Sequence, residues 1–472
     1  MAFSDDLFFA PAHQLAAMLR AREVSSVEMV SAFIERIESV NHGLNAVVTL
    51  VEERGGREAE EADRRLAGKN ARPLEGLPIS IKDSVMTEGV RSTDGMKIFE
   101  HYVPDADAPT VARLRAAGAI VIAKTNLPEM AMDYDCDNPV FGATNNPWNR
   151  DRVPGGSSGG EAAALAVGMS PLGLGSDYGG SIRIPSHFCG TVGLKPTWGT
   201  IPGTGHMPPG PGGAPPPIAH MATIGPMARF VDDLTLSYNI LKGPHHAAVY
   251  TVPSADVHPE SVDLKKVRCA IFTGTSLTPV AKDIRSAIER AGKELQNLGI
   301  PVDDVTPPVA EGAELWPQYA MADGNQLGLE ALKEHLHLAR ERFRNQMIAL
   351  PGKSAAEFFK IAMARDAWRV KLAEFMEQYP IILGPAFCVT AFKHGAFEVD
   401  IDGKNFSLYA ANWPALWVNC AGLPGAVVPA GKDRDGLPIG IQIVGRAFGE
   451  ETVLAIAKAA EGALGGFQRP PL

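Results

Sequence analysis

The sequence predicts an α/β fold, because short apolar strand patterns alternate with helical patterns along most of the chain. No low-complexity or charged linker interrupts residues 60–460. Residues 325–378 depart from the alternation and show a dominantly helical pattern. We therefore predict a single domain over residues 1–472, with a mostly helical insertion around residues 310–378.

The first half of the chain shows the alternation most clearly. A capping-box pair, Ser25 and Glu28, precedes apolar residues at helical spacing and predicts a helix start. The elements expected next are a charged helix over residues 52–67, a strand over 77–82, a helix over 109–117, a strand over 119–123, a helix over 161–167 and a strand over 169–175.

The second half continues the same alternation after a long loop. Residues 202–217 are so rich in proline and glycine that we expect no regular structure. A loop of this length inside a domain is more often a functional lip than a linker. The expected elements beyond it are strands over 267–273, 301–305, 381–383, 425–428 and 439–444, and helices over 281–298 and from Glu451 onward.

Composition excludes several classes of partner. The formal net charge of −10 argues against nucleic acid, because phosphate binding needs a basic surface. The 5 cysteines are widely spaced and form no C-x-x-C pair, which predicts reduced thiols in a cytoplasmic protein. The N-terminus is acidic, unlike a signal peptide, and no uncharged apolar run reaches the ~18 residues of a membrane span. We therefore expect a cytoplasmic chain with no membrane partner.

The first glycine cluster, residues 155–160, contains two hydroxyl groups that are candidates for catalysis, those of Ser157 and Ser158. It fits G-x-S-x-G twice, but the nucleophile elbow of α/β-hydrolases needs a strand before the serine, and residues 146–154 predict a loop. A glycine-rich helix start is the structural alternative, and it explains only part of the cluster.

The second cluster, residues 175–183, places Ser181 directly after two glycines. Successive backbone N–H groups in such a segment can converge into an anion-binding nest. That is the geometry of an oxyanion hole. A tight turn that leads into a helix is the alternative interpretation.

A serine nucleophile needs a base, and Lys82 is the favoured candidate. His187, His206 and His220 stand in no recognisable arrangement. Lys82 ends an apolar strand pattern, where burial would lower the pKa of its amine toward neutrality. The alternative is a surface lysine that closes the strand. The sequence has no S-x-x-K or H-E-x-x-H pattern, and we predict neither a metal nor a cofactor.

Together these stretches resemble the amidase signature family. The family pattern G-G-S-S-G-G-E followed by G-S-D-x-G-G-S-I-R-x-P stands at residues 155–161 and 175–185. Further matching stretches are L-P-I-S-I-K-D (77–83), A-K-T-N (123–126), N-P-W-N (146–149), C-G-T-V-G-L-K-P-T (189–197), I-G-P-M-A-R (224–229), G-L-P-G-A-V-V-P-A-G (422–431) and I-G-I-Q-I-V-G (439–445). The resemblance is weakest over residues 245–415. It implies a single α/β/α layered domain around a large mixed β-sheet.

The resemblance also implies a role for each motif residue. Ser181 corresponds to the nucleophile, Ser157 to a bridging serine preceded by a cis peptide bond, and Lys82 to the base. The residues whose backbone amides correspond to the oxyanion hole are Tyr178, Gly179, Gly180 and Ser181. Ser158 and Asp177 correspond to residues that support these groups.

This set of residues predicts a serine amidase that cleaves linear amide C–N bonds through an acyl-enzyme. Residues 133–142 resemble the fatty-acid-amide hydrolase branch more than the glutamine-using transamidosome subunit, and Ile184 stands where that subunit usually carries glutamine. We expect an apolar pocket lined by Met132, Tyr134 and residues 202–217. Such a pocket suits a small neutral amide, whether aliphatic, aryl or anilide, with carbamates and esters as further candidates.

Three other functions stay open. The chain is alternatively the glutaminase-type subunit of an amidotransferase that depends on a protein partner, or a hydrolase of cyclic oligoamides. A binding protein without turnover is disfavoured by the intact Ser–Ser–Lys set. The sequence does not fix the oligomeric state, and a homo-oligomer is one of the open alternatives.

Overall fold

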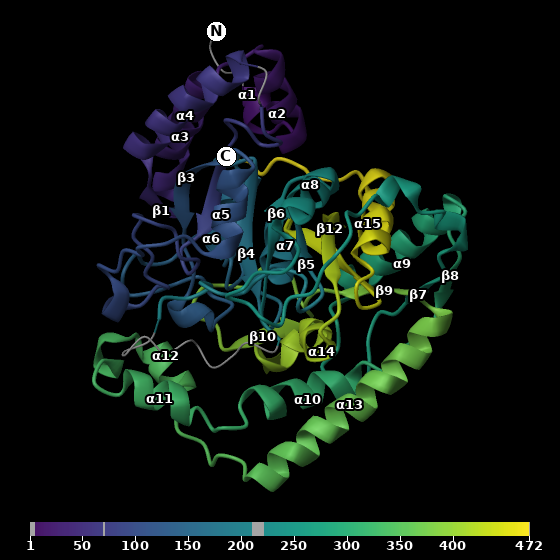
Figure 1. Cartoon of the computed structure of the whole chain (residues 1–472). Coiled ribbons are helices and arrows are strands. Elements are labelled where there is room, and N and C mark those ends of the chain that lie inside the picture. Colours follow the sequence, from purple (N-terminus) through teal and green to yellow (C-terminus); the bar gives the residue numbers. More distant parts are fainter. Residues whose placement is uncertain (1–4, 69–70, 210–220, 472) are drawn as a thin grey trace.

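Over the residues that the computed structural model describes (5–68, 71–209 and 221–471), the chain folds around a mixed sheet of 11 strands (Figure 1). In sheet order the strands are β1 (Val47–Leu50), β3 (Ile120–Thr125), β2 (Pro78–Lys82), β4 (Leu172–Asp177), β6 (Thr223–Ala228), β5 (Val192–Lys195), β12 (Gly425–Lys432), β13 (Pro438–Gly445), β9 (Ile381–Pro385), β7 (Cys269–Ile271) and β8 (Val302–Asp304). A separate hairpin pairs β10 (Glu398–Ile401) with β11 (Lys404–Ser407). The large mixed sheet implied by the resemblance is confirmed.

Strands β2 and β4 run parallel and side by side. Ser80 of β2 pairs with Gly173 of β4. Both strands therefore end at the same edge of the sheet, β2 on Lys82 and β4 on Asp177. On the outer side of β2 the parallel run continues into β3, whereas β6 is antiparallel to β4. Two segments that are far apart in the sequence thus finish next to each other.

Helices cover both faces of the sheet. Successive side chains of a strand point to opposite faces, and β13 shows what each face meets. Gln442 accepts a hydrogen bond from Arg183 of α7 (Arg183–Cys189), whereas a side chain at Gly445 would contact Val453 of α15 (Glu450–Leu464). Because these two positions lie on opposite faces, the fold has the predicted α/β/α layers.

Further helices complete the two layers. Their bounds are α1 (Asp5–Phe8), α2 (Ala12–Ala21), α3 (Ser26–Val40), α4 (Glu52–Ala67), α5 (Pro109–Ala116), α6 (Gly159–Ala166), α8 (Val231–Leu241) and α9 (Lys282–Asn297). Helix α6 packs against α7 and against β2 and β4, and both α8 and α9 pack against α15. The start of α6 thereby lies near the ends of β2 and β4.

Residues 310–378 contain helices and no strand. These helices are α10 (Ala310–Ala320), α11 (Gln326–Leu332), α12 (Glu341–Gln346) and α13 (Ala355–Gln378), and they lie along the lower edge of the molecule in Figure 1. Helix α10 packs against α13 and against α14 (Trp413–Ala421). A Cβ atom at Gly312 would lie 2.0 Å from the Trp368 ring, so α13 touches the backbone of α10.

Several local predictions are confirmed. Ser25 and Glu28 form both hydrogen bonds of a capping box at the start of α3, and α4 has the predicted bounds. All cysteines are buried free thiols. Residues 202–209 contain no helix or strand, and residues 210–217 of the expected loop lie outside the described residues. Among the helices of the described chain, none combines the length and the apolar character that a membrane span needs.

Candidate active site

A buried lysine at the end of β2 contacts two serine hydroxyls. The amine nitrogen of Lys82 lies 2.6 Å from Oγ of Ser157 and 2.9 Å from Oγ of Ser176. Ser176 is the penultimate residue of β4, and Ser157 lies just before α6. Two neighbouring strand ends and a helix start therefore supply the three groups. The structure brings Lys82 and Ser157 together, as the resemblance implies.

The environment of Lys82 makes its neutral form more accessible than that of an exposed lysine. The side chain is fully buried, and burial lowers its pKa to about 8. The nearby acidic group of Asp94 acts most strongly in the opposite direction. Burial also raises the pKa of Asp94 well above its usual range, which weakens that opposition. An amine with such a pKa can accept a proton near neutral pH.

Ser157 follows a cis peptide bond. The bond between Gly156 and Ser157 is cis, as the resemblance implies. Packing requires glycine at the first position, because a Cβ atom at Gly156 would lie 2.1 Å from the carbonyl oxygen of Asp133. Any side chain at position 156 would therefore prevent the close approach of this backbone to that of Asp133.

Ser158 and Asp177 hold the loop that carries Ser181. The N–H of Ser158 donates to the carbonyl of Ser181 at 3.1 Å, and its hydroxyl lies 3.3 Å from backbone atoms of Ser176. Asp177 is buried in an ion pair with Arg183 at 2.9 Å. Burial acts to raise the pKa of Asp177, but Arg183 outweighs it and holds that pKa well below its usual range. These contacts are consistent with the supporting roles expected of both residues.

The backbone amides that precede Ser181 depart from expectation at one position. The N–H of Gly180 donates to Oδ1 of Asp177 at 2.8 Å, so it is not available to a substrate oxygen. Within the described residues, the N–H groups of Tyr178, Gly179 and Ser181 have no hydrogen-bond partner. The expected set of four donors is therefore corrected, because Asp177 binds one of them.

Ser181 lines a pocket of about 140 Å³ together with Ser157 and Ser176. Among the described residues its hydroxyl has no hydrogen-bond partner, so the bond between Ser181 and Ser157 is not formed in this structure. Hydrogen bonds of this kind often tighten only when substrate is bound. Ser181 and Ser157 nevertheless line the same pocket.

The walls of this pocket are mostly apolar. Its other lining residues are Met130, Ala131, Met132, Asp133, Tyr134, Tyr178, Gly179, His206, Met207, Ala222 and Trp316. The two predicted substrate contacts, Met132 and Tyr134, both lie in the wall. The carboxylate of Asp133 is paired with Arg342. None of the lining residues in the described chain is a lysine or an arginine.

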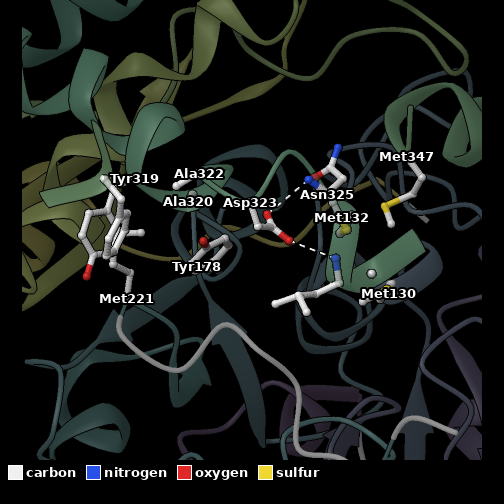
Figure 2. Close-up of a pocket in the computed structure, with 13 residues that line it drawn as sticks. Met130, Met132, Tyr178, Met221, Tyr319, Ala320, Ala322, Asp323, Asn325 and Met347 are labelled. Atoms are coloured by element: carbon white, nitrogen blue, oxygen red, sulfur yellow. Dashed lines mark hydrogen bonds between the residues drawn. The ribbon is translucent and has the colours of Figure 1, made fainter. Parts of the chain in front are cut away.

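A second cavity of about 360 Å³ adjoins the first and shares Met130, Met132 and Tyr178 with it (Figure 2). The rest of its lining comes from α10, α11 and α13 and from residues between the elements, namely Met221, Ala322, Asp323, Asn325 and Met347. Its one charged lining residue in the described chain is Asp323, whose carboxylate accepts hydrogen bonds from the N–H groups of Asn325 and Leu327, as Figure 2 shows. A substrate that extends beyond the first pocket would therefore meet methionine and aromatic side chains.

Three site residues are not predicted by the sequence. Ser176 lies inside the second glycine motif but carries no signal of its contact with Lys82. Trp316 lies in the segment where the resemblance is weakest. His206 is a rejected base candidate, and its Nε2 is buried without a partner among the described residues. Burial lowers the pKa of His206 to about 3, so its imidazole is neutral.

Of the other histidine candidates, His187 does not enter the site. The ring of His187 is buried, accepts from the N–H of Gly440 at 2.6 Å and lies 3.1 Å from the carbonyl of Val389, which accounts for both ring nitrogens. His220 lies outside the described residues. A search of the described part of the chain finds no group of three or more His, Cys, Asp or Glu side chains that could hold a metal.

Comparison with known proteins gives consistent results. The Amidase family model matches residues 28–454. One subunit of the glutamyl-tRNA(Gln) amidotransferase of Thermosynechococcus vestitus is 34% identical over an alignment 487 positions long, which covers 97% of this chain and 98% of that protein. Among solved structures, a bacterial aryl acylamidase of the amidase signature family has a TM-score of 0.85 at 25% identity and covers 96% of each chain. The 6-aminohexanoate cyclic dimer hydrolase, complexed with substrate, has a TM-score of 0.83 at 27% identity and covers 98% of this chain and 99% of that one.

Proposed function

The chain belongs to the amidase family, and from that premise we propose that it hydrolyses neutral carboxylic acid amides through an acyl-enzyme on Ser181. One observation carries the proposal. The buried amine of Lys82 lies within hydrogen-bond distance of Ser157. Ser157 in turn lines an apolar pocket that Ser181 also lines. A neutral lysine, a bridging hydroxyl and a nucleophile hydroxyl are the parts that such a reaction needs.

In the proposed reaction Ser181 Oγ attacks the amide carbonyl while its proton passes to Ser157. The proton of Ser157 passes to neutral Lys82, and the N–H groups of Tyr178, Gly179 and Ser181 stabilise the negative oxygen. The same relay then runs backwards and protonates the leaving nitrogen as the C–N bond breaks. Water, deprotonated by the relay, attacks the ester of Ser181, and the carboxylic acid leaves.

The pocket supports a neutral substrate. Methionine and aromatic side chains form most of the walls, and the two cavities share them. A free glutamine would bring an α-carboxylate, which usually pairs with arginine or lysine. Since no such side chain lines either cavity in the described chain, an aryl amide, an anilide or a long aliphatic amide fits the site better. The structural similarity to an aryl acylamidase supports the same substrate class.

A second candidate is the glutaminase-type subunit of an amidotransferase that acts with a protein partner. The specific observation in its favour is the similarity to a glutamyl-tRNA(Gln) amidotransferase subunit over nearly the whole of both chains. On sequence relatives alone this candidate is favoured over the fatty-acid-amide hydrolase branch. A cyclic oligoamide substrate would use the same chemistry and is supported by the fold similarity to the cyclic dimer hydrolase.

The deciding experiment measures amine release by the purified chain with aliphatic amides, anilides, carbamates, a cyclic diamide and glutamine. We expect turnover of neutral amides or anilides and none of glutamine, and loss of turnover in Ser181→Ala. Ser170→Ala is the matched control, because the Ser170 hydroxyl is buried and bonds only the Leu172 carbonyl, at 2.7 Å. If glutamine alone is cleaved, the subunit function replaces this proposal.

A further inference from the structure

Four consecutive backbone carbonyls before Ser181 each accept a hydrogen bond. The acceptors and their donors are the carbonyl of Asp177 with Nδ2 of Asn419 (3.2 Å), that of Tyr178 with Nε1 of Trp316 (3.1 Å), that of Gly179 with Nδ2 of Asn412 (2.9 Å) and that of Gly180 with the N–H of Ile184 (2.7 Å). Three of these donors are side chains from distant parts of the sequence. Every peptide unit of the loop therefore has a fixed orientation.

These bonds determine where the amide hydrogens point. In a trans peptide unit the C=O and the N–H of the next residue point in opposite directions. Fixing the carbonyl of Tyr178 thus fixes the N–H of Gly179, and fixing that of Gly180 fixes the N–H of Ser181. The N–H groups of Tyr178, Gly179 and Ser181 each belong to a peptide unit with an anchored carbonyl, and they lack a partner in the described chain. The remaining N–H, of Gly180, is bound by Asp177.

The side-chain donors come from two helices that pack on each other. Trp316 belongs to α10, while Asn412 and Asn419 lie immediately before and within α14. The indole of Trp316 also packs on the Tyr178 ring with centroids 5.0 Å apart. Its ring lies 3.4 Å from where a Cβ atom of Gly179 would be, so the contact follows the loop backbone closely.

We infer that Trp316 is a positioning residue that aims the N–H of Gly179, a donor of the oxyanion hole, at the substrate carbonyl, and that Asn412 supports it by holding the neighbouring peptide unit. The inference rests on the proposed function of Ser181 as nucleophile. Neither side chain exchanges protons with the substrate. Trp316 acts through the peptide that carries the N–H of Gly179. Asn412 holds the peptide between Gly179 and Gly180, whose N–H is bound by Asp177, and so acts by keeping the loop in place. The helical segment 310–378 thus takes part in catalysis although it carries none of the catalytic serines.

Trp316→Phe tests the inference, because phenylalanine keeps an aromatic wall and removes the indole N–H. Loss of one oxyanion-hole donor typically lowers kcat about 100- to 1000-fold, and a donor that is merely misaimed loses part of this. We expect kcat to fall about tenfold or more while KM stays within about twofold, since binding of the uncharged substrate does not use the oxyanion donors. Asn412→Ala frees the next carbonyl, whose peptide unit carries no donor for the substrate, and is expected to lower kcat by a smaller factor.

Trp368→Phe is the matched control. The Trp368 indole donates to the Pro308 carbonyl at 2.6 Å and packs against α10, so this variant also loses an indole hydrogen bond to a backbone carbonyl, but away from the Ser181 loop. The Trp368 side chain lines neither cavity. We expect its thermal stability to fall and its kcat to stay unchanged. Equal losses of kcat in Trp316→Phe and Trp368→Phe would mean that a loss of general packing lowers kcat, and not a change in the direction of the Gly179 N–H.

A second readout does not depend on knowing the substrate. A fluorophosphonate modifies an active serine through a transition state that also places negative charge on oxygen. We expect its rate of reaction with Ser181 to fall at least as strongly as kcat in Trp316→Phe and in Asn412→Ala. Normal labelling rates in both folded variants overturn the inference. A wild-type chain that labels rapidly but cleaves no amide overturns the proposed function and leaves this inference standing.

Discussion

The amine of Lys82 lies 2.6 Å from the hydroxyl of Ser157, although 75 positions separate the two residues in the sequence. Parallel pairing of β2 with β4 and the packing of α6 on both strands create this proximity. Because the same amine also contacts Ser176, its proton affinity depends on two hydroxyls.

The first prediction concerns pH. Burial lowers the pKa of Lys82 to about 8, so the neutral base is the minor form at pH 7 and the major form above pH 9. We expect kcat/KM to rise with pH through about 8 and then to level off. Lys82→Ala is expected to lower kcat about 100- to 10,000-fold and to abolish this rise. A flat wild-type profile from pH 6 to 10, with chemistry rate-limiting, would contradict a lysine base.

The second prediction concerns Ser176. Its hydroxyl accepts a hydrogen bond from the Lys82 amine, and an acceptor stabilises the protonated form more than the neutral one. Ser176→Ala should therefore lower the pKa of Lys82 further, by about one unit, and move the midpoint of the pH profile to lower pH. The midpoint of Ser170→Ala should stay at the wild-type value. A shift of the Ser176→Ala midpoint toward higher pH would count against this arrangement.

The third prediction concerns the buried ion pair between Asp177 and Arg183. Arg183→Met leaves the carboxylate buried without its cation, which typically costs about 3–5 kcal/mol of unfolding free energy. Urea denaturation measures this loss. The double variant Asp177→Asn/Arg183→Met should recover part of it, because no unpaired charge remains. A double variant that is less stable than Arg183→Met alone would refute the explanation.

The fourth prediction concerns His206. Its Nε2 is buried in the pocket wall without a partner in the described chain, and such an atom costs free energy in the empty protein. We expect His206→Leu to raise the unfolding free energy by about 1 kcal/mol and to lower kcat/KM for substrates that supply a hydrogen-bonding group there. Thermal denaturation and steady-state kinetics on the same preparation test both parts. Lower stability together with unchanged kinetics would show that His206 has a purely structural role.

The sequence predicts the elements that have strong local signals. The capping box at Ser25 and the charged pattern of residues 52–67 locate α3 and α4 closely. Helix α14 is missed, because it is buried on all sides and has no amphipathic period. Strand β6 is missed as well, since it contains Gly225 and Pro226, which have low β-propensity. Periodicity detects elements with one exposed face, and these two have none.

The candidate site divides in the same way. Lys82, Ser157 and Ser181 come from motifs, but their spacing in the sequence gives no distance, and only the resemblance joins them before the fold is known. The bond of Gly180 to Asp177 depends on loop geometry that residue types do not determine. Trp316 could not be predicted, because a single tryptophan in a helical segment has no pattern that points to a backbone carbonyl elsewhere.

The packing of α10 against α14 has a consequence for how this protein can diversify. Lys82 ends β2, Ser157 lies just before α6 and Ser181 lies in the loop between β4 and α7, whereas α10, α11 and α13 line much of the outer cavity. Changes in these helices can alter substrate range while the Ser–Ser–Lys relay stays intact. Trp316 limits that freedom, because a substitution in α10 that widens the cavity must still leave an N–H donor for the backbone carbonyl of Tyr178. Because Trp316 both lines the first pocket and holds the Tyr178 carbonyl, we expect a substitution there to change substrate range and catalytic rate together.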